Sequence, residues 1–174
     1  MIKKYKEYEK EILSLVDELN SKQSFLYIES ENILILGFGS EISNLRATAG
    51  NVIVIDIEPK EINLNNVKFI NNDLNSGFPD LSTKFDLVVA NFIMEYIQEK
   101  KIFFKNIIEK LTNSGILVIG LWFHNRILSP KLEYKFRDFF NKIGFKIINM
   151  EVIERNVNDP NFMPKVLFIT LERE

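Results

Sequence analysis

The sequence predicts an α/β domain: a seven-stranded, mostly parallel sheet with helices on both faces and an antiparallel last strand. Three observations lead to this prediction. From residue 32 onward, short apolar runs rich in isoleucine and valine recur without the alternation of a half-exposed strand, as is typical of parallel strands covered on both faces. Helix-like stretches separate several of these runs. The last two runs have no helix between them, so they are expected to pair as an antiparallel hairpin.

Seven segments are expected to form the sheet. The first five, which are short and mostly apolar, are Ile33–Leu36, Val52–Ile55, Val67–Ile70, Leu87–Ala90 and Ile116–Leu121. The last two are Phe145–Ile153 and Lys165–Leu171, joined by a polar segment over 154–164. Because a hairpin reverses the chain, only the last strand is expected to run against the others.

Three segments have the apolar spacing or the end signals of helices. The first twenty residues place apolar side chains at helical spacing and charged side chains on the other face. A second helix is expected over 103–111, before the stop signal Asn113-Ser114-Gly115. A third begins at Ser129-Pro130, with serine as N-cap and proline at the first helical position, and ends at Gly144.

The 174 residues are expected to form one domain, 1–174, with an amphipathic helix over 1–22 and a core over 30–171. The formal net charge of −2 lacks the basic excess of proteins that hold duplex nucleic acid through its phosphates. The absence of cysteine excludes a disulfide scaffold, a thiolate metal site and a cysteine nucleophile, and no metal site is predicted. No apolar run approaches the roughly 20 residues of a membrane span, and the charged first residues lack a secretory signal. We therefore expect a cytoplasmic protein with no membrane partner.

Glycines and polar residues follow the predicted strands at their carboxyl ends. Gly37 and Gly39 follow the first strand, Asp56 the second, Asp73 the third and Asn91 the fourth. In open α/β sheets, ligands bind outside the carboxyl ends of the strands, where the strand order reverses. These residues are therefore expected to converge on one binding site.

The residue types at this edge suit a cationic nucleoside, because two acids are present without a lysine or arginine to hold phosphate. The glycine loop at Gly37 allows a sharp turn and close approach of a ligand. Asp56, 19 residues further on, could accept hydrogen bonds from both ribose hydroxyls. Asp73 could accept from the exocyclic amine of adenine, and the Leu74 N–H could donate to the ring. Each residue also has a structural interpretation, as a turn glycine, a helix cap, a loop acid or, for Asn91, a partner of backbone groups.

Six segments resemble successive motifs of the class I S-adenosylmethionine-dependent methyltransferases. They are ILILGFGSEIS, VIVIDIEPKEI, FINNDLNSGFP, FDLVVANFIMEYI, LTNSGILVIGLW and GFKIINMEVIE. The resemblance spans about residues 30–171 and includes the reversed last strand. It implies the Rossmann-like fold of that family, S-adenosyl-L-methionine as cofactor, and methyl transfer as the activity.

The resemblance also implies which residues bind the cofactor. They are Gly37, Phe38, Gly39, Asp56, Ile57, Asp73, Leu74 and Asn91. The glycine loop would pack under the methionine part, and Asp56 would hold the ribose. Asp73 and Leu74 would flank the adenine, and Asn91 would lie near the amino acid or the methyl group.

Two positions depart from the pattern of the family. The family usually has an acid two residues before the first glycine, where this chain has Ile35, and a third glycine where Glu41 follows Ser40. A non-catalytic adenosyl-binding or structural subunit that needs a partner is therefore an alternative. NAD binding is a weaker alternative. The dinucleotide-binding fingerprint needs a third glycine, and this chain has Ile42 at that position.

The methyl acceptor is expected to be a small molecule. Residues 91–94, Asn-Phe-Ile-Met, differ from the Asn/Asp-Pro-Pro-aromatic motif that resembles enzymes methylating adenine, cytosine or glutamine. An RNA methyltransferase working with an accessory protein is the second alternative, and a homodimer or another protein partner is compatible with the sequence. His124, Tyr96 and Glu95 are the candidate bases, but His124 is expected in an exposed loop and Tyr96 in packing at a helix start. No catalytic residue is therefore named.

Overall fold

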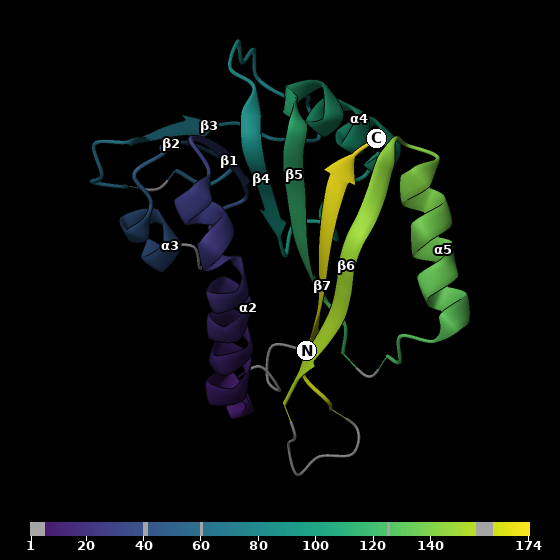
Figure 1. The fold of residues 1–174 in the computed structure, drawn as a ribbon. Helices are drawn as coiled ribbons and strands as arrows, with labels where there is room; N and C mark the ends of the chain where they lie inside the picture. The colour runs from purple at the N-terminus through teal and green to yellow at the C-terminus, as the bar shows by residue number, and fades with distance from the viewer. Residues whose placement is uncertain (1–5, 40–41, 60, 125, 156–161) are drawn as a thin grey trace.

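The computed structural model describes residues 6–174 apart from 40–41, 60, 125 and 156–161. One sheet forms its centre, with the strands in the order β3-β2-β1-β4-β5-β7-β6 (Figure 1). The strands are β1 (Asn32–Leu36), β2 (Asn51–Asp56), β3 (Val67–Asn71), β4 (Phe85–Asn91), β5 (Leu111–Trp122), β6 (Phe145–Glu154) and β7 (Lys165–Arg173). All seven predicted strands are present, with wider bounds. The largest difference is in β5, which begins at Leu111 and so includes the predicted stop signal at 113–115.

The strand directions confirm the predicted reversal of the last strand. β1 pairs in parallel with β2 and β4, β2 with β3, and β4 with β5. β7 lies between β5 and β6 and is antiparallel to both. Because β1 has β2 on one side and β4 on the other, the strand order reverses at β1, where open α/β sheets bind ligands.

Helices cover both faces of the sheet, as predicted (Figure 1). α4 (Lys100–Lys110) and α5 (Pro130–Asn141) pack on one face, where Phe103, Phe104 and Phe140 join one hydrophobic cluster. α2 (Glu9–Glu29) and α3 (Ile42–Ala47) pack on the other face, where Leu15, Leu19 and Tyr27 of α2 join a second cluster. No helix in the described ranges is long and apolar enough to cross a membrane.

The start of α5 agrees with the sequence signals, whereas α2 is longer than predicted. At α5, the Ser129 hydroxyl accepts a hydrogen bond from the Leu132 N–H at 3.3 Å, and Pro130 occupies the first turn. α2 continues to Glu29, past the predicted end at residue 22, and so brings the fully buried Gln23 and Tyr27 onto the sheet.

The alternation of strands and helices is incomplete. In the described parts of the β2–β3 and β3–β4 connections no helix is present. These segments contain Pro59, Gly77 and Pro79, residues that disfavour a helix interior. Tyr96, predicted to pack at a helix start, instead lies in a turn before α4, and its side chain is 72% exposed. The carboxyl ends of β2, β3 and β4 are therefore followed by loops, which form the candidate site.

Candidate functional site

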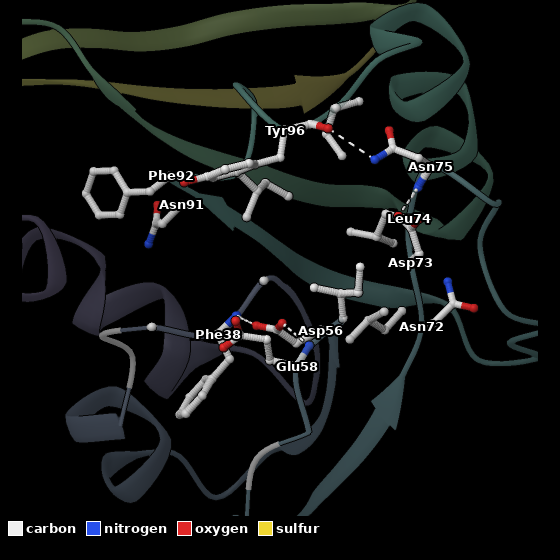
Figure 2. A pocket seen from close by; sticks show the side chains of 16 residues that line it. Phe38, Asp56, Glu58, Asn72, Asp73, Leu74, Asn75, Asn91, Phe92 and Tyr96 are labelled. Atoms are coloured by element: carbon white, nitrogen blue, oxygen red, sulfur yellow. Dashed lines mark hydrogen bonds between the residues drawn. The ribbon is translucent and has the colours of Figure 1, made fainter. Parts of the chain in front are cut away.

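The loops at the carboxyl ends of β1 to β4 surround a cavity of about 660 Å³ (Figure 2). This volume is within the range of small-molecule sites. The eight residues that the resemblance implicates in cofactor binding all line it: Gly37, Phe38, Gly39, Asp56, Ile57, Asp73, Leu74 and Asn91. Four further lining residues, Glu58, Asn72, Asn75 and Ile93, were not singled out by the sequence. Tyr96, which the sequence named as a candidate base but expected in packing, also lines the cavity.

The Asp56 carboxylate joins the loop after β1 to the end of β2. One carboxylate oxygen accepts from the Phe38 N–H at 2.6 Å, and the other accepts from the Glu58 N–H at 2.8 Å. The Gly37 N–H donates to the Ile55 carbonyl at 2.8 Å, so the start of the turn is also bonded to β2. Each carboxylate oxygen keeps a further lone pair, and Asp56 can therefore still accept from a ligand while its orientation is fixed.

The two glycines of the loop have different surroundings. Gly37 has a φ of +75°, and a Cβ added there would lie 2.2 Å from the Ile93 Cγ2 atom. A Cβ at Gly39 would meet nothing within 4 Å. Gly37 is thus required by the turn and by the packing of Ile93, whereas the open space that a ligand could use lies beside Gly39. Ser40 and Glu41, where the loop departs from the family pattern, lie outside the described residues.

The loop after β3 is a tight turn that Asn75 attaches to the loop after β4. The Asn75 N–H donates to the Asp73 carboxylate at 2.9 Å, and the Ser76 N–H donates to the Asp73 carbonyl at 2.9 Å. The Asn75 amide donates to the Tyr96 carbonyl at 3.1 Å and accepts from the Gln98 N–H at 2.9 Å. Asp73 and the turn around Tyr96 are therefore held on the same side of the cavity.

Asn91 closes the end of the cavity where α2 crosses the sheet. Its side chain is 4% exposed and exchanges two hydrogen bonds, of 3.0 and 2.9 Å, with the amide of the fully buried Gln23. A Cβ at Gly120 would lie 2.8 Å from the Asn91 side-chain oxygen, so the glycine in β5 leaves room for this pair. The sequence places Asn91 at the strand end but gave no signal for Gln23, because the two residues are far apart in the chain.

His124 lies in the turn after β5, as predicted, but it is half-buried in an aromatic column and not exposed, which corrects the prediction. Its ring stacks on Trp122 at 5.2 Å between centroids and lies 5.1 Å from Phe162. Its Nδ1 atom accepts from the Lys165 N–H at 3.3 Å. Burial lowers the pKa of His124, and a hydrogen bond to the Met163 backbone opposes this effect in part. The lowered pKa and the accepting Nδ1 atom both favour the neutral ring, and His124 joins the end of β5 to the start of β7.

The column reaches the cavity through Phe92. Phe92 stacks on Trp122 at 4.3 Å, and it is the only non-glycine residue of the described chain with a positive φ, of 58°. A left-handed conformation is costly for a bulky side chain and is often found at functional sites. It turns the aromatic ring toward Trp122, while the next residue, Ile93, packs on Gly37.

The charged residues among the described lining of the cavity are all acidic. Asp56, Glu58 and Asp73 line the half next to β2 and β3, and no lysine, arginine or histidine is among the described lining residues. No group of three or more acids or histidines in the described chain is arranged to hold a metal ion. The cavity therefore favours a neutral or positively charged organic ligand with hydroxyl or amine donors.

The sequence of the chain was compared with models of known protein families. Residues 35–119, from β1 to β5, match the family model of a methyltransferase domain. No curated protein matches the chain in sequence.

Solved structures of low sequence identity share the fold. The N-methyltransferase NodS from Bradyrhizobium japonicum WM9, in complex with S-adenosyl-L-homocysteine, aligns with a TM-score of 0.65 at 14% identity over 97% of each chain. TYW2 from M. jannaschii, in complex with AdoMet, aligns with a TM-score of 0.59 at 22% identity over 90% of this chain and 75% of that one. A candidate RNA methyltransferase from Pyrococcus horikoshii, PH1948, aligns with a TM-score of 0.61 at 14% identity over 91% and 81%.

Proposed function

We propose that this chain, which belongs to the class I S-adenosylmethionine-dependent methyltransferase family, transfers a methyl group to a small-molecule acceptor bound in the cavity at the carboxyl ends of β1 to β4. The observation that carries the proposal is the convergence of three carboxylates and an open glycine backbone on one cavity, with no basic side chain among its described lining residues. S-Adenosylmethionine, which supplies an electrophilic methyl group on a sulfonium when bound, is cationic at sulfur and carries ribose and adenine donors.

The residues present fit this cofactor. Asp56 has an orientation fixed by two backbone N–H groups and retains acceptor capacity for the ribose hydroxyls. Asp73 provides an acceptor for the adenine amine, and the Leu74 N–H has no partner among the described residues and could donate to the adenine ring. Ile57, which is 64% exposed, offers an apolar surface for the base.

The remaining wall is assigned to the methionine end of the ligand. The Gly37–Gly39 loop gives open backbone at Gly39, and Phe38 fixes the loop to Asp56. The Asn91 amide is occupied by Gln23, so we assign Asn91 to the shape of the wall at this end.

The protein contributes mainly alignment to the proposed reaction. Methyl transfer is an in-line displacement, in which the rate depends on holding the nucleophile, the carbon and the leaving sulfur in one line. A base is needed only if the acceptor is protonated at the working pH. His124 does not line the cavity, and its Nδ1 is engaged with the Lys165 N–H, so no base is assigned to it.

The charge of the lining favours a small acceptor over RNA. RNA phosphates near Asp56, Glu58 and Asp73 would be repelled, and proteins that bind nucleic acid gain most of their affinity from basic contacts. An RNA acceptor remains the alternative, with an accessory protein supplying those contacts. Tight RNA binding by the chain alone, with a steep dependence on salt, would support that alternative.

Calorimetric titration with S-adenosylmethionine and S-adenosylhomocysteine tests the cofactor site. We expect both compounds to bind, and Asp56→Ala to weaken each by about tenfold or more, because hydrogen bonds to a charged acceptor are lost. Asp80→Asn, an exposed acid of the β3–β4 loop outside the cavity, is the matched control and should leave binding unchanged. Absence of binding to the wild-type protein would instead support a structural subunit that needs a partner.

A further inference from the structure

Tyr96 is an aromatic residue that lines the cavity although most of its side chain is exposed. It is 72% exposed, and its hydroxyl group has no hydrogen-bond partner among the described residues. Figure 2 shows the side chain lying on the β4 side of the cavity and pointing toward Asn91 and Phe92. Exposure alone is common on this chain, but Tyr96 is an exposed aromatic residue that also lines the cavity.

The backbone that carries Tyr96 is held on both sides. The Tyr96 N–H donates to the Ile93 carbonyl at 2.9 Å, and the Tyr96 carbonyl accepts from the Asn75 amide at 3.1 Å. Asn75 belongs to the same turn as Asp73, on the adenine side of the proposed cofactor site. The backbone that carries the ring is therefore fixed relative to the loop expected to hold the ligand.

The polar groups around the cavity are divided between its two halves. The carboxylates of Asp56, Glu58 and Asp73 come from the loops after β2 and β3. On the β4 side, the Asn91 amide is engaged with Gln23. The hydroxyl group of Tyr96 is thus the protic side-chain group available on the β4 side, and no base lies beside it among the described lining residues.

We propose that Tyr96 contacts the methyl acceptor and that the acceptor is a small uncharged amine. This inference rests on the proposed function of the cavity. The phenol oxygen accepts a hydrogen bond from the acceptor N–H, which directs the nitrogen lone pair toward the methyl carbon. A neutral amine needs no base to attack, whereas an alcohol would need one, and none lines this half of the cavity.

The atoms and charges of this step balance without another reactant. The nitrogen lone pair forms the new bond to carbon as the carbon–sulfur bond breaks, and the bonding pair remains on sulfur, which becomes neutral. The product nitrogen carries the positive charge and then releases its proton to water. Tyr96 stays neutral throughout and acts only by orienting the acceptor.

The test uses two probes that do not require the natural acceptor. One is S-adenosylhomocysteine, and the other is the S-adenosylmethionine analogue in which an amine-bearing carbon replaces the methylated sulfur, so that the amine occupies the place of the methyl group. Calorimetry on the full chain gives the ratio of the two dissociation constants for the wild-type protein, Tyr96→Phe and Tyr134→Phe. Tyr134 is 70% exposed on α5, outside the cavity, and serves as the matched control.

We expect Tyr96→Phe to weaken binding of the amine analogue three- to tenfold and to leave S-adenosylhomocysteine binding unchanged, because one hydrogen bond is lost. Tyr134→Phe should change neither constant. An unchanged ratio in Tyr96→Phe would overturn the proposal, and so would equal weakening of both probes, which would place Tyr96 against the adenosyl group. If neither probe binds the wild-type protein, the proposed function itself fails, and this inference with it, before any variant is compared.

Discussion

Gly37 is a residue whose backbone conformation and surroundings allow little change. Its φ of +75° is one that side chains rarely adopt, and Ile93 fills the space beside it. The turn at Gly37 also presents the Phe38 N–H to Asp56. A single backbone conformation therefore positions the carboxylate on which the proposed ribose contact depends.

Gly37→Ala is expected to lower the free energy of unfolding by about 2 kcal/mol, through the unfavourable φ and the contact with Ile93. Gly39→Ala should change it by less than about 0.5 kcal/mol, because nothing lies within 4 Å of the added methyl group. Urea unfolding of both variants measures the difference. Equal stabilities would contradict the description of this loop.

His124 is the only histidine of the chain. A change in the free energy of unfolding at a pH of about 6.5 can therefore be assigned to this side chain. Its pKa in the folded state is lowered by burial, so the unfolded state binds the proton more readily. The stabilisation from neutral His124 is therefore fully present above the unfolded pKa of about 6.5 and is lost as the pH falls toward the folded pKa.

Urea unfolding from pH 7.5 down to about 5.5 measures this effect. The wild-type protein is expected to lose stability as the pH falls through that range. His124→Phe, which retains an aromatic ring beside Trp122, should show a flatter profile. Identical slopes for the two proteins would show that the histidine is as easily protonated when folded as when unfolded.

Among the elements, α2 has the most direct effect on the cavity wall. Its Gln23 pairs with Asn91, and the Leu19 side chain packs where a Cβ at Gly120 would lie, at 2.7 Å. Two ion pairs fix the helix at the other side: Glu18 with Arg155 at 2.5 Å and Lys22 with Glu151 at 3.0 Å. These surface pairs add little stability, so the buried amide pair is the specific contact.

A double-mutant cycle on Gln23→Ala and Asn91→Ala tests this contact. Each single substitution is expected to cost about 2 kcal/mol, because it leaves a buried amide without its partner. The double variant should be more stable than the sum predicts, with a coupling of about 1 kcal/mol. If the two losses simply add, the interaction between Gln23 and Asn91 does not contribute to the stability of the protein.

At the scale of the whole molecule, the fold was predictable because its signals are local and repeated. Apolar runs identified all seven strands, and the lack of a helix between the last two identified the reversed strand. The three helices that the sequence specified correspond to α2, α4 and α5, whereas no helix follows β2 or β3 in the described residues. The prediction ended α2 too early, since the second half of this helix is buried by contacts with distant strands.

The candidate site was predictable only in part. Residues at strand ends could be located from the sequence, since parallel topology brings these ends together. The contacts of Asn91 with Gln23 and of Asn75 with Tyr96 join residues far apart in the chain and leave no local pattern. The position of His124 was wrong for the same reason, since Phe162 and Lys165 reach it from another strand connection.

The central claim is that one cavity of this sheet holds an adenosyl ligand between the loops after β2 and β3. A crystal structure of the protein grown with S-adenosylhomocysteine tests it most directly. We predict ribose hydroxyls within hydrogen-bond distance of the Asp56 carboxylate and the adenine beside Asp73 and Leu74. Ligand density outside this cavity, or a ribose that does not contact Asp56, would contradict the account.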